Sequence, residues 1–490
     1  MAPLAHRAAY LSLARLANYG LMLLSPIILT RVLTVEEFGH YREFLLYATI
    51  LQSVGNFAIG DSLLYFIPAH PESPWRIVRQ TVALTFCTTL VTCLCLVGFD
   101  FAMGGAVVGP YLWQLVLYLM LSANLDFWEM YWLANHRSAA MFGYTASRLI
   151  VRIAVVTIVA TATRDVSTII WSLIVIEALR FVGSAVAFAK IDRSAQEPPL
   201  NEPWREQLRF CIPSGTGSLI AYMNRYFAGV FVTKVLGAVW LAQYSIGRFP
   251  EPVIAVVRNT LSTVVLPEMV RRGRDNPEVQ VALWRRATAM NAVLLLPVIV
   301  LVIRYAEIAV TTVFGHSYAA AAPLMQIFML SIFRECFDFA PALRAMNKAS
   351  PLVYSNLAAL VVCAAAMLLL TPSFGVNGAM MAAVMSAYVD GFWQARSVCR
   401  RLGKTMGELL PWSSVARTVL AAVLASAVII SSMWTDTLGF AGVVFAGAAY
   451  MVAYLVLLKL LRVPEADVLL TAVWRAFAGM SRARLRARHE

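Results

Sequence analysis

Long apolar stretches alternate with short polar segments along almost the whole chain. Fourteen of these stretches reach about the 18–20 residues that a helix needs to cross a bilayer. Because a backbone in lipid must satisfy its own hydrogen bonds, each stretch predicts an α-helix. Charged residues interrupt the fourth to sixth and the eighth stretches. The predicted spans are residues 9–32, 43–67, 81–103, 111–134, 140–162, 168–189, 209–235, 240–266, 287–306, 320–343, 351–371, 376–395, 412–434 and 438–459.

The composition supports a membrane protein throughout. Hydrophobic residues make up 60% of the 490 positions and charged residues 14%, with a mean hydropathy of +0.71. A soluble protein of this size could not bury so much apolar surface. The seven cysteines and six histidines show no metal-ligand or disulfide spacing, so we expect no metal and no cofactor. The predicted fold class is therefore an all-α polytopic membrane protein with about fourteen transmembrane helices.

The basic residues define an orientation. If the N-terminus is cytoplasmic, 26 of the 40 basic residues fall on the cytoplasmic side and five on the other. This asymmetry follows the positive-inside rule and predicts that both termini are cytoplasmic, in a bacterial inner membrane. The net charge of +13 then faces anionic membrane lipids, and nucleic acid is not needed as a partner. Residues 463–490 predict a basic interfacial tail on the same leaflet.

A weak internal repeat suggests two homologous halves. The segment that begins at Thr30 and reaches Tyr41 resembles the segment from Thr233 to Tyr244, at a constant offset of 203 residues. Both copies lie at an outer hairpin, and six spans separate them, so the repeat is parallel. We expect two six-helix lobes around a central cavity, followed by two further helices. The predicted parts are the N-lobe 1–190, a cytoplasmic linker 191–208, the C-lobe 209–400, two C-terminal spans in 401–462 and the tail 463–490.

Two segments resemble a known family. The stretch LARLANYGLMLLSPIILTRVLTVEEFGHYREFLLYATIL, above all the part from Leu33 to Tyr41, resembles the opening of Wzx-type O-antigen and exopolysaccharide flippases. The later VFGHSYAAAAPLMQI is similar to that family's segment between its ninth and tenth spans. These flippases belong to the multidrug/oligosaccharidyl-lipid/polysaccharide exporter superfamily. The resemblance implies transfer of undecaprenyl-pyrophosphate-linked oligosaccharides to the periplasmic leaflet, with a polysaccharide polymerase and chain-length machinery as possible partners, and no enzymatic activity.

Ionised groups inside the spans each need a reason, because one at the bilayer centre costs at least about 2.5–3.5 kcal/mol. Some have a candidate ion-pair partner one helical turn away, namely Glu177 with Arg180, Arg248 with Glu251, and Arg334 with Asp338. Asp126 and Arg148 are equally far from the turn that joins their spans, so they could pair at one depth. Local pairing accounts for these groups without a functional role.

Four arginines have no local partner, and two lie in each half. Arginine suits a pyrophosphate because its planar guanidinium stays charged and donates several hydrogen bonds. We expect these four to line the substrate cavity, with two of the paired arginines as further candidates. The predicted cavity residues are Arg15, Arg152, Arg225 and Arg258, together with Arg148 and Arg248.

Three acidic residues are candidates for coupling to H⁺ or Na⁺: Asp61, Glu129 and Asp390. Each could equally cap a helix or pair with an arginine. A lipid II flippase would share the predicted cavity chemistry and stays open as an alternative. A cation-coupled multidrug exporter of the same superfamily should have an acidic or aromatic cavity, which the arginines disfavour. A membrane enzyme would need a large outer loop, and no predicted outer loop exceeds about fifteen residues.

Overall fold

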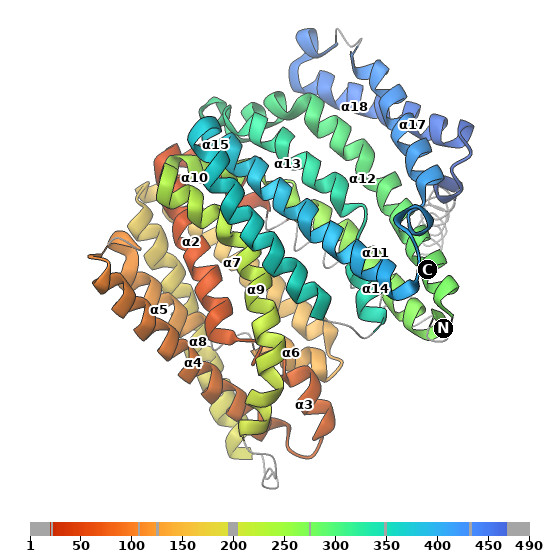
Figure 1. The fold of residues 1–490 in the computed structure, drawn as a ribbon. Coiled ribbons are helices and arrows are strands. Elements are labelled where there is room, and N and C mark those ends of the chain that lie inside the picture. Colours follow the sequence, from red (N-terminus) through yellow and green to blue (C-terminus); the bar gives the residue numbers. More distant parts are fainter. Residues whose placement is uncertain are drawn as a thin grey trace, which may run out of the picture. The chain divides into compact units, whose positions relative to one another are not determined.

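The computed structural model describes Gly20 and residues 23–105, 108–123, 127–194, 204–273, 276–346, 350–430 and 434–467. Within these ranges every regular element is an α-helix or a single 3-10 turn, so the predicted all-α architecture is confirmed (Figure 1). The helices are α2 (Val35–Asn56), α3 (Leu63–Ala69), α4 (Pro74–Ala102), α5 (Leu112–Ser122), α6 (Phe127–Ala134), α7 (Ser138–Thr163), α8 (Val166–Ser194), α9 (Trp204–Leu236), α10 (Ala238–Gly247), α11 (Glu251–Gly273), α12 (Pro277–Phe314), α13 (Ala321–Glu335), α14 (Ala340–Ala345), α15 (Ser350–Leu402), α16 (Met406–Leu409), α17 (Trp412–Ile430) and α18 (Trp434–Leu460), with 3-10 turns at Gly109–Tyr111 and His316–Tyr318.

The helices overlap the predicted spans, with different boundaries at several of them. Among the described residues, eight helices are long and apolar enough to cross a bilayer. One of them, α15, has a break at Gly375, where φ is +57°, and its two segments correspond to the predicted spans 351–371 and 376–395. The more polar α2 and α9 overlap two other predicted spans. The chain is therefore a multi-pass membrane protein.

The boundaries of α2 differ from the predicted span 43–67. The helix begins at Val35, because Thr34 and Glu37 form a capping box in which each side chain accepts a hydrogen bond from the other's backbone N–H. It ends before Phe57 and Ala58, which adopt left-handed backbone conformations at φ +41° and +59°. The span thus begins earlier than hydropathy alone predicts, and its last residues belong to the separate helix α3.

The predicted span 240–266 is broken into two helices. Here α10 ends at Gly247 and α11 begins at Glu251. Pro250 lies in the break, where its lack of an N–H and its ring prevent a continuous helical ladder. The contact pattern divides the chain at the same place into two compact units, Met1–Phe249 with Ala359–Ala382, and Pro250–Ala358 with Ala383–Glu490. The division into two six-helix lobes stays a prediction.

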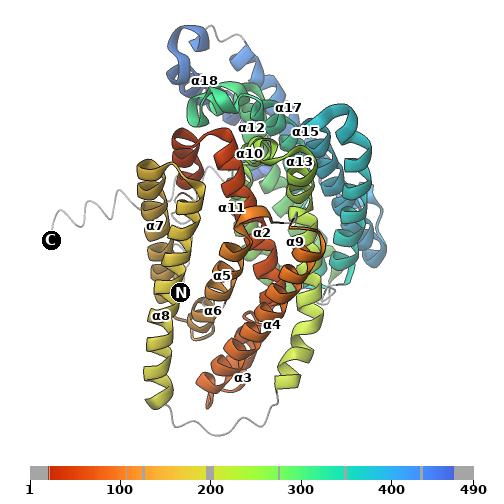
Figure 2. The same cartoon turned by 90° about the vertical axis from the view of Figure 1, so that its left-hand side faces the viewer.

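In the first unit, α2 packs against α4, α9 and α10 (Figures 1 and 2). The first residues of α2 and α10, Val35 and Ala238, are separated by the repeat offset of 203 residues, so both copies start a helix at the same point. The contact is close. A Cβ added at Gly39 would lie 2.1 Å from the carbonyl oxygen of Ala238. The repeat counterpart of Gly39 is Ala242, which is fully buried. Small residues therefore set the distance between the two helices.

A buried polar network fixes the start of α9 against α3 and α4. The Gln207 side chain donates hydrogen bonds of 2.7 Å to the hydroxyls of Ser62 and Thr81 and accepts one of 2.9 Å from Gln80. Farther along α9, a Cβ at Gly215 would lie 2.6 Å from the Phe57 carbonyl oxygen. The end of α2 thus lies close against α9, and hydrogen bonds of Gln207 join α9 to the start of α3 and to α4.

In the second unit, α12 is the central helix and contacts α11, α13, α17 and α18 (Figure 1). The Tyr454 hydroxyl of α18 donates a 2.9 Å hydrogen bond to the Val293 carbonyl oxygen of α12. At the other end of α12, Trp284 stacks on Phe339 and donates a 2.7 Å hydrogen bond to the Asp338 carbonyl oxygen. These contacts attach α18, and the segment between α13 and α14, to α12.

The close approach of α2 and α10 predicts that Gly39→Ala destabilises the protein. The new methyl group would collide with backbone rather than with a flexible side chain, so the helices must separate, at a cost of about 1–3 kcal/mol. Thermal unfolding of the purified protein in detergent measures the effect. The matched control is Gly98→Ala on α4, where an added Cβ has no heavy atom within 4 Å. Equal melting temperatures for the two variants would contradict the predicted tight contact.

Candidate functional site

The charged residues of the spans were the predicted site, and the structure describes most of them. Arg15 and Asp126 lie outside the described residues, as does the tail beyond residue 467. No group of three or more His, Cys, Asp or Glu side chains among the described residues could hold a metal ion. The site is therefore built from guanidiniums, carboxylates and tyrosine hydroxyls, which form three separate groups.

The first group is a balanced ion-pair network between α6, α7 and α8. Glu177 is almost fully buried and pairs with Arg180 on its own helix, as the sequence predicted, and with Arg148 at 3.7 Å. Arg148 also lies 3.6 Å from Glu129. Arg180 donates a 3.1 Å hydrogen bond to the Tyr144 hydroxyl. Two cations and two anions thus neutralise one another, which is how buried charges are usually tolerated.

The second group is an arginine cluster in the first unit, made of Arg42, Arg152, Arg225 and Arg248. Arg42 on α2 has the guanidiniums of Arg152 and Arg248 among its main electrostatic neighbours. The Arg248 guanidinium, which follows α10, donates a 3.3 Å hydrogen bond to the Arg225 carbonyl oxygen on α9. The guanidiniums of Arg42, Arg152 and Arg248 therefore lie in one region, and the backbone of Arg225 lies against Arg248. Two of the four, Arg152 and Arg225, were predicted cavity residues without local partners, and Arg248 was a further candidate.

Tyrosines surround the arginine cluster. Arg152 has the buried Tyr118 and Tyr41 as its main electrostatic neighbours, together with the carboxylate of Glu177 from the first group. Arg248 is 3.4 Å from the Tyr244 hydroxyl. On α9, Tyr226 lies near Arg42 and stacks on Tyr222 at 5.9 Å between ring centroids. These hydroxyls accept hydrogen bonds from guanidiniums but carry no negative charge that would neutralise them.

Arg225 is exposed, and among the described residues its guanidinium has neither a hydrogen-bond nor an ion-pair partner. One turn farther along α9, a Cβ at Gly229 would contact Leu46 of α2 and Leu241 of α10. Positions 225 and 229 are four residues apart, so they share one face of α9. An unpaired cation within a predicted membrane span is expensive, so this position calls for an anionic ligand or a route to water.

Arg42 was missed by the sequence analysis, which placed it at the outer end of a span. The signal that could have identified it is the capping box at Thr34 and Glu37. Once α2 is known to begin at Val35, Arg42 lies about 10 Å inside the helix at 1.5 Å per residue. It is therefore part of the arginine cluster and not of the outer hairpin.

The third group lies in the second unit, where each arginine is paired with a distant carboxylate. Arg258 on α11 forms an ion pair with Glu335 at the end of α13. Asp338 accepts hydrogen bonds from the Ser262 hydroxyl at 3.0 Å and from the Ala340 backbone N–H at 3.1 Å. Arg258 had no local partner in the sequence, and its partner is supplied by another helix.

The predicted pair of Arg334 with Asp338 is wrong. Arg334 pairs instead with Asp390 of α15. Asp390 also accepts a 2.8 Å hydrogen bond from Gln394. A Cβ at Gly391 would lie 2.4 Å from the Arg334 Nε, so this glycine makes room for the guanidinium. The missing side chain at position 391 lets Arg334 reach across to α15 rather than down its own chain.

Asp61, the remaining candidate for ion coupling, occupies the turn between α2 and α3. It is exposed and follows the two residues with left-handed backbone. The turn is stabilised by a 2.9 Å hydrogen bond from the Gly60 N–H to the Asn56 side-chain oxygen. The other two candidates, Glu129 and Asp390, are ion-paired with Arg148 and Arg334.

Comparison with known proteins places this arrangement in a family. The model of the family described as polysaccharide biosynthesis protein matches residues 28–323, which is more than half of the chain. No curated protein matches the sequence significantly.

Solved structures share the fold. The lipid II flippase MurJ in an inward closed conformation is similar with a TM-score of 0.70 and 11% identity, over 92% of this chain and 99% of that one. An inward-facing multidrug resistance MATE family transporter of the MOP superfamily gives a TM-score of 0.55 at 12% identity, over 80% and 99%. A mutant of the Vibrio cholerae MATE transporter VcmN gives 0.54 at 12% identity, over 83% and 98%. The chain therefore belongs to the polysaccharide biosynthesis protein family, as its resemblance to the Wzx-type flippases implied, and has the fold seen in MurJ and MATE transporters.

Proposed function

We propose that this protein moves undecaprenyl-pyrophosphate-linked oligosaccharide units from the cytoplasmic to the periplasmic leaflet, for O-antigen or exopolysaccharide assembly. The observation that carries the proposal is the arginine cluster of the first unit, where Arg42, Arg152 and Arg248 lie among tyrosines and Arg152 also has a carboxylate, Glu177, among its main neighbours. Such a surplus of positive charge within membrane spans is stable only with an anionic ligand or water. The family membership supports the same conclusion.

The chemistry of the cluster suits a pyrophosphate. A guanidinium stays protonated and can donate two parallel hydrogen bonds to phosphate oxygens. Arg225 is exposed, its backbone carbonyl oxygen accepts a hydrogen bond from Arg248, and Arg248 and Arg152 in turn lie near Arg42. The stacked Tyr222 and Tyr226 provide flat apolar faces with hydroxyls, which suit sugar rings. In this proposal the head group crosses along the cluster by alternating access, while the polyprenyl chain stays in lipid.

Two alternatives follow from the same fold. A lipid II flippase would also need to bind a pyrophosphate, and the likeness to MurJ keeps this reading as the second candidate. A multidrug exporter of cations is disfavoured, because clustered guanidiniums would repel its substrates at about 4 kcal/mol per pair at 4 Å and an effective dielectric constant of 20.

Asp61, Glu129 and Asp390 remain the proposed sites of coupling to H⁺ or Na⁺. Glu129 and Asp390 would have to release an arginine before they could take up either ion. The proposed location is the bacterial inner membrane, with both termini in the cytoplasm. The basic residues divide between the two sides as the positive-inside rule requires. A polymerase and chain-length machinery remain proposed partners.

Removing single members of the arginine cluster should slow transport. In cells that lack the native gene, Arg225→Gln and Arg42→Gln should reduce surface glycan about tenfold or more, since a hydrogen bond to a charged group contributes about 1.5–3 kcal/mol. The lipid-linked intermediate should accumulate in the cytoplasmic leaflet. The measurements are the amount of surface glycan and the amount of the intermediate in each leaflet.

The matched control is Arg209→Gln, which removes an exposed charge from the same helix α9 near its start. This variant should restore glycan export to the wild-type level. Normal export by the Arg225 and Arg42 variants would contradict a role of the cluster. Normal export without the gene, combined with lost drug resistance, would favour the multidrug exporter.

The ion pair of Arg258 with Glu335 should be structural. Arg258→Gln or Glu335→Gln should each lower stability by on the order of 1–3 kcal/mol, because the remaining partly buried charge loses its partner. The charge-swapped double variant, Arg258→Glu with Glu335→Arg, should recover most of the melting temperature and of the glycan export. Recovery of stability without export would instead show that Arg258 itself contacts the substrate.

A further inference from the structure

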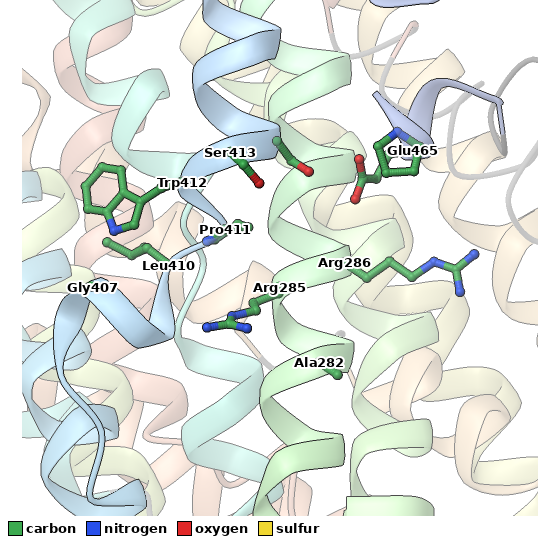
Figure 3. Close-up of a pocket in the computed structure, with 11 residues that line it drawn as sticks. Ala282, Arg285, Arg286, Gly407, Leu410, Pro411, Trp412, Ser413 and Glu465 are labelled. Carbon is green, nitrogen blue, oxygen red and sulfur yellow. The ribbon is translucent and has the colours of Figure 1, made fainter. Parts of the chain in front are cut away.

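A further charged site, separate from the three groups described above, lies in the second unit where the start of α17 meets α12. Here α12, the start of α17 and the segment after α18 enclose a cavity of about 690 Å³ (Figure 3). Its polar lining consists of Arg285, Arg286, Ser413, Ser414 and Glu465. The arginine cluster of the proposed function contributes none of these residues, so the cavity is a separate feature of the molecule.

The cavity lies at the level expected for lipid head groups. The apolar part of α17 begins at Trp412, and the membrane-crossing helix runs on to Ile429. The Trp412 side chain is 56% exposed at the rim of the cavity. Tryptophan at the end of a span is typical of the boundary between hydrocarbon and water. A phospholipid in the adjoining leaflet would therefore have its phosphate beside the cavity and its chains along the helices.

The cationic side of the cavity is held in place by α12. The Arg285 Nε donates a 3.1 Å hydrogen bond to the Leu409 carbonyl oxygen, which fixes the guanidinium and leaves its two terminal NH₂ groups for a ligand. Arg286 is exposed and has no ion-pair partner in the described part of the chain. Figure 3 shows Arg285 extending toward Leu410 and Pro411 and Arg286 extending to the other side. The hydroxyl of Ser413 at the start of α17 adds a donor to the positive end of that helix.

The acidic side carries an unused acceptor. The Glu465 Oε2 atom is buried and accepts no hydrogen bond within the described residues. A buried acceptor without a donor costs about 1–3 kcal/mol. A ligand that fits this cavity should therefore present a hydrogen-bond donor to Glu465 as well as negative charge to the arginines.

We propose that the cavity binds the head group of phosphatidylglycerol. The side chains that line the cavity, two guanidiniums and one carboxylate, carry one net positive charge, which the single negative charge of a phosphodiester neutralises. Glu408, which lies near Arg285 outside the lining, also lies near Lys404, so this pair adds no net charge. The hydroxyls of the glycerol head then donate to Glu465. Phosphatidylethanolamine would bring its own positive charge and leave the surplus in place, and phosphatidylcholine has no donor. The lipid thereby joins α17 to α12 at the membrane surface.

The test is native mass spectrometry of the delipidated full-length protein in detergent, titrated with phosphatidylglycerol, phosphatidylethanolamine or phosphatidylcholine. Raised ionic strength screens exposed basic surface, so that binding in the cavity dominates. Phosphatidylglycerol should bind most tightly. Arg286→Gln should weaken this binding about tenfold, as loss of one charge-assisted hydrogen bond predicts. Without lipid, the melting temperature of the Arg286→Gln variant should match that of the wild type, since the Arg286 side chain is exposed.

The matched control is Arg400→Gln, which removes an exposed charge of α15 that does not line the cavity and should change the affinity by less than about twofold. Equal losses in the two variants, or equal affinity for all three lipids, would overturn the proposal. Tighter binding of phosphatidylethanolamine would show that Glu465 accepts a hydrogen bond from the ammonium group of that lipid. It would contradict the proposal that the cavity selects a glycerol head group. Competition by soluble glycerol phosphate at the concentrations used for the lipid would show that the site takes a soluble phosphate ester instead.

Discussion

In hydrocarbon no water is available to a backbone amide or an ionised side chain, so each such group must find a partner within the protein or be kept for a ligand. This cost organises the fold. It makes every described regular element a helix or a 3-10 turn, and it places Glu177 between two arginines. It also explains the glycine at position 391, without which Arg334 could not reach the carboxylate that neutralises it. Charges without a compensating partner in the protein are therefore candidates for ligand binding.

The three charged groups of the spans are compensated to different degrees, and this difference carries the functional argument. In the second unit, Arg258 and Arg334 each have a carboxylate on another helix, so their charges are compensated. In the first unit, Arg42 has tyrosines and other guanidiniums as its main neighbours, and Arg225 has no partner within the described residues. Desolvated cations held close together repel one another, and an anionic ligand relieves that repulsion. A pyrophosphate head group has the charge and the acceptor geometry to do so.

The two copies of the internal repeat begin alike but form helices of different length. Both α2 and α10 begin at the same repeat position, and small residues let them approach closely. Yet α2 continues for 22 residues, whereas α10 stops after 10 because Pro250 follows. The break leaves Arg248 at the end of a helix, where its guanidinium reaches the backbone of α9. A single proline therefore turns one copy of the repeat into part of the arginine cluster.

The sequence by itself determined the features that depend on neighbouring residues. Hydropathy located the spans, and the family resemblance rested on a contiguous segment. The i,i+3 pair of Glu177 with Arg180 followed from helical periodicity. Only the tertiary structure decided the partners of Arg258 and Arg334, which are 77 and 56 residues away along the chain. The same holds for the arginine cluster, which gathers residues from four helices. Helical periodicity states which side chains share a face, but packing between helices decides which faces meet, and that information is not local in the sequence.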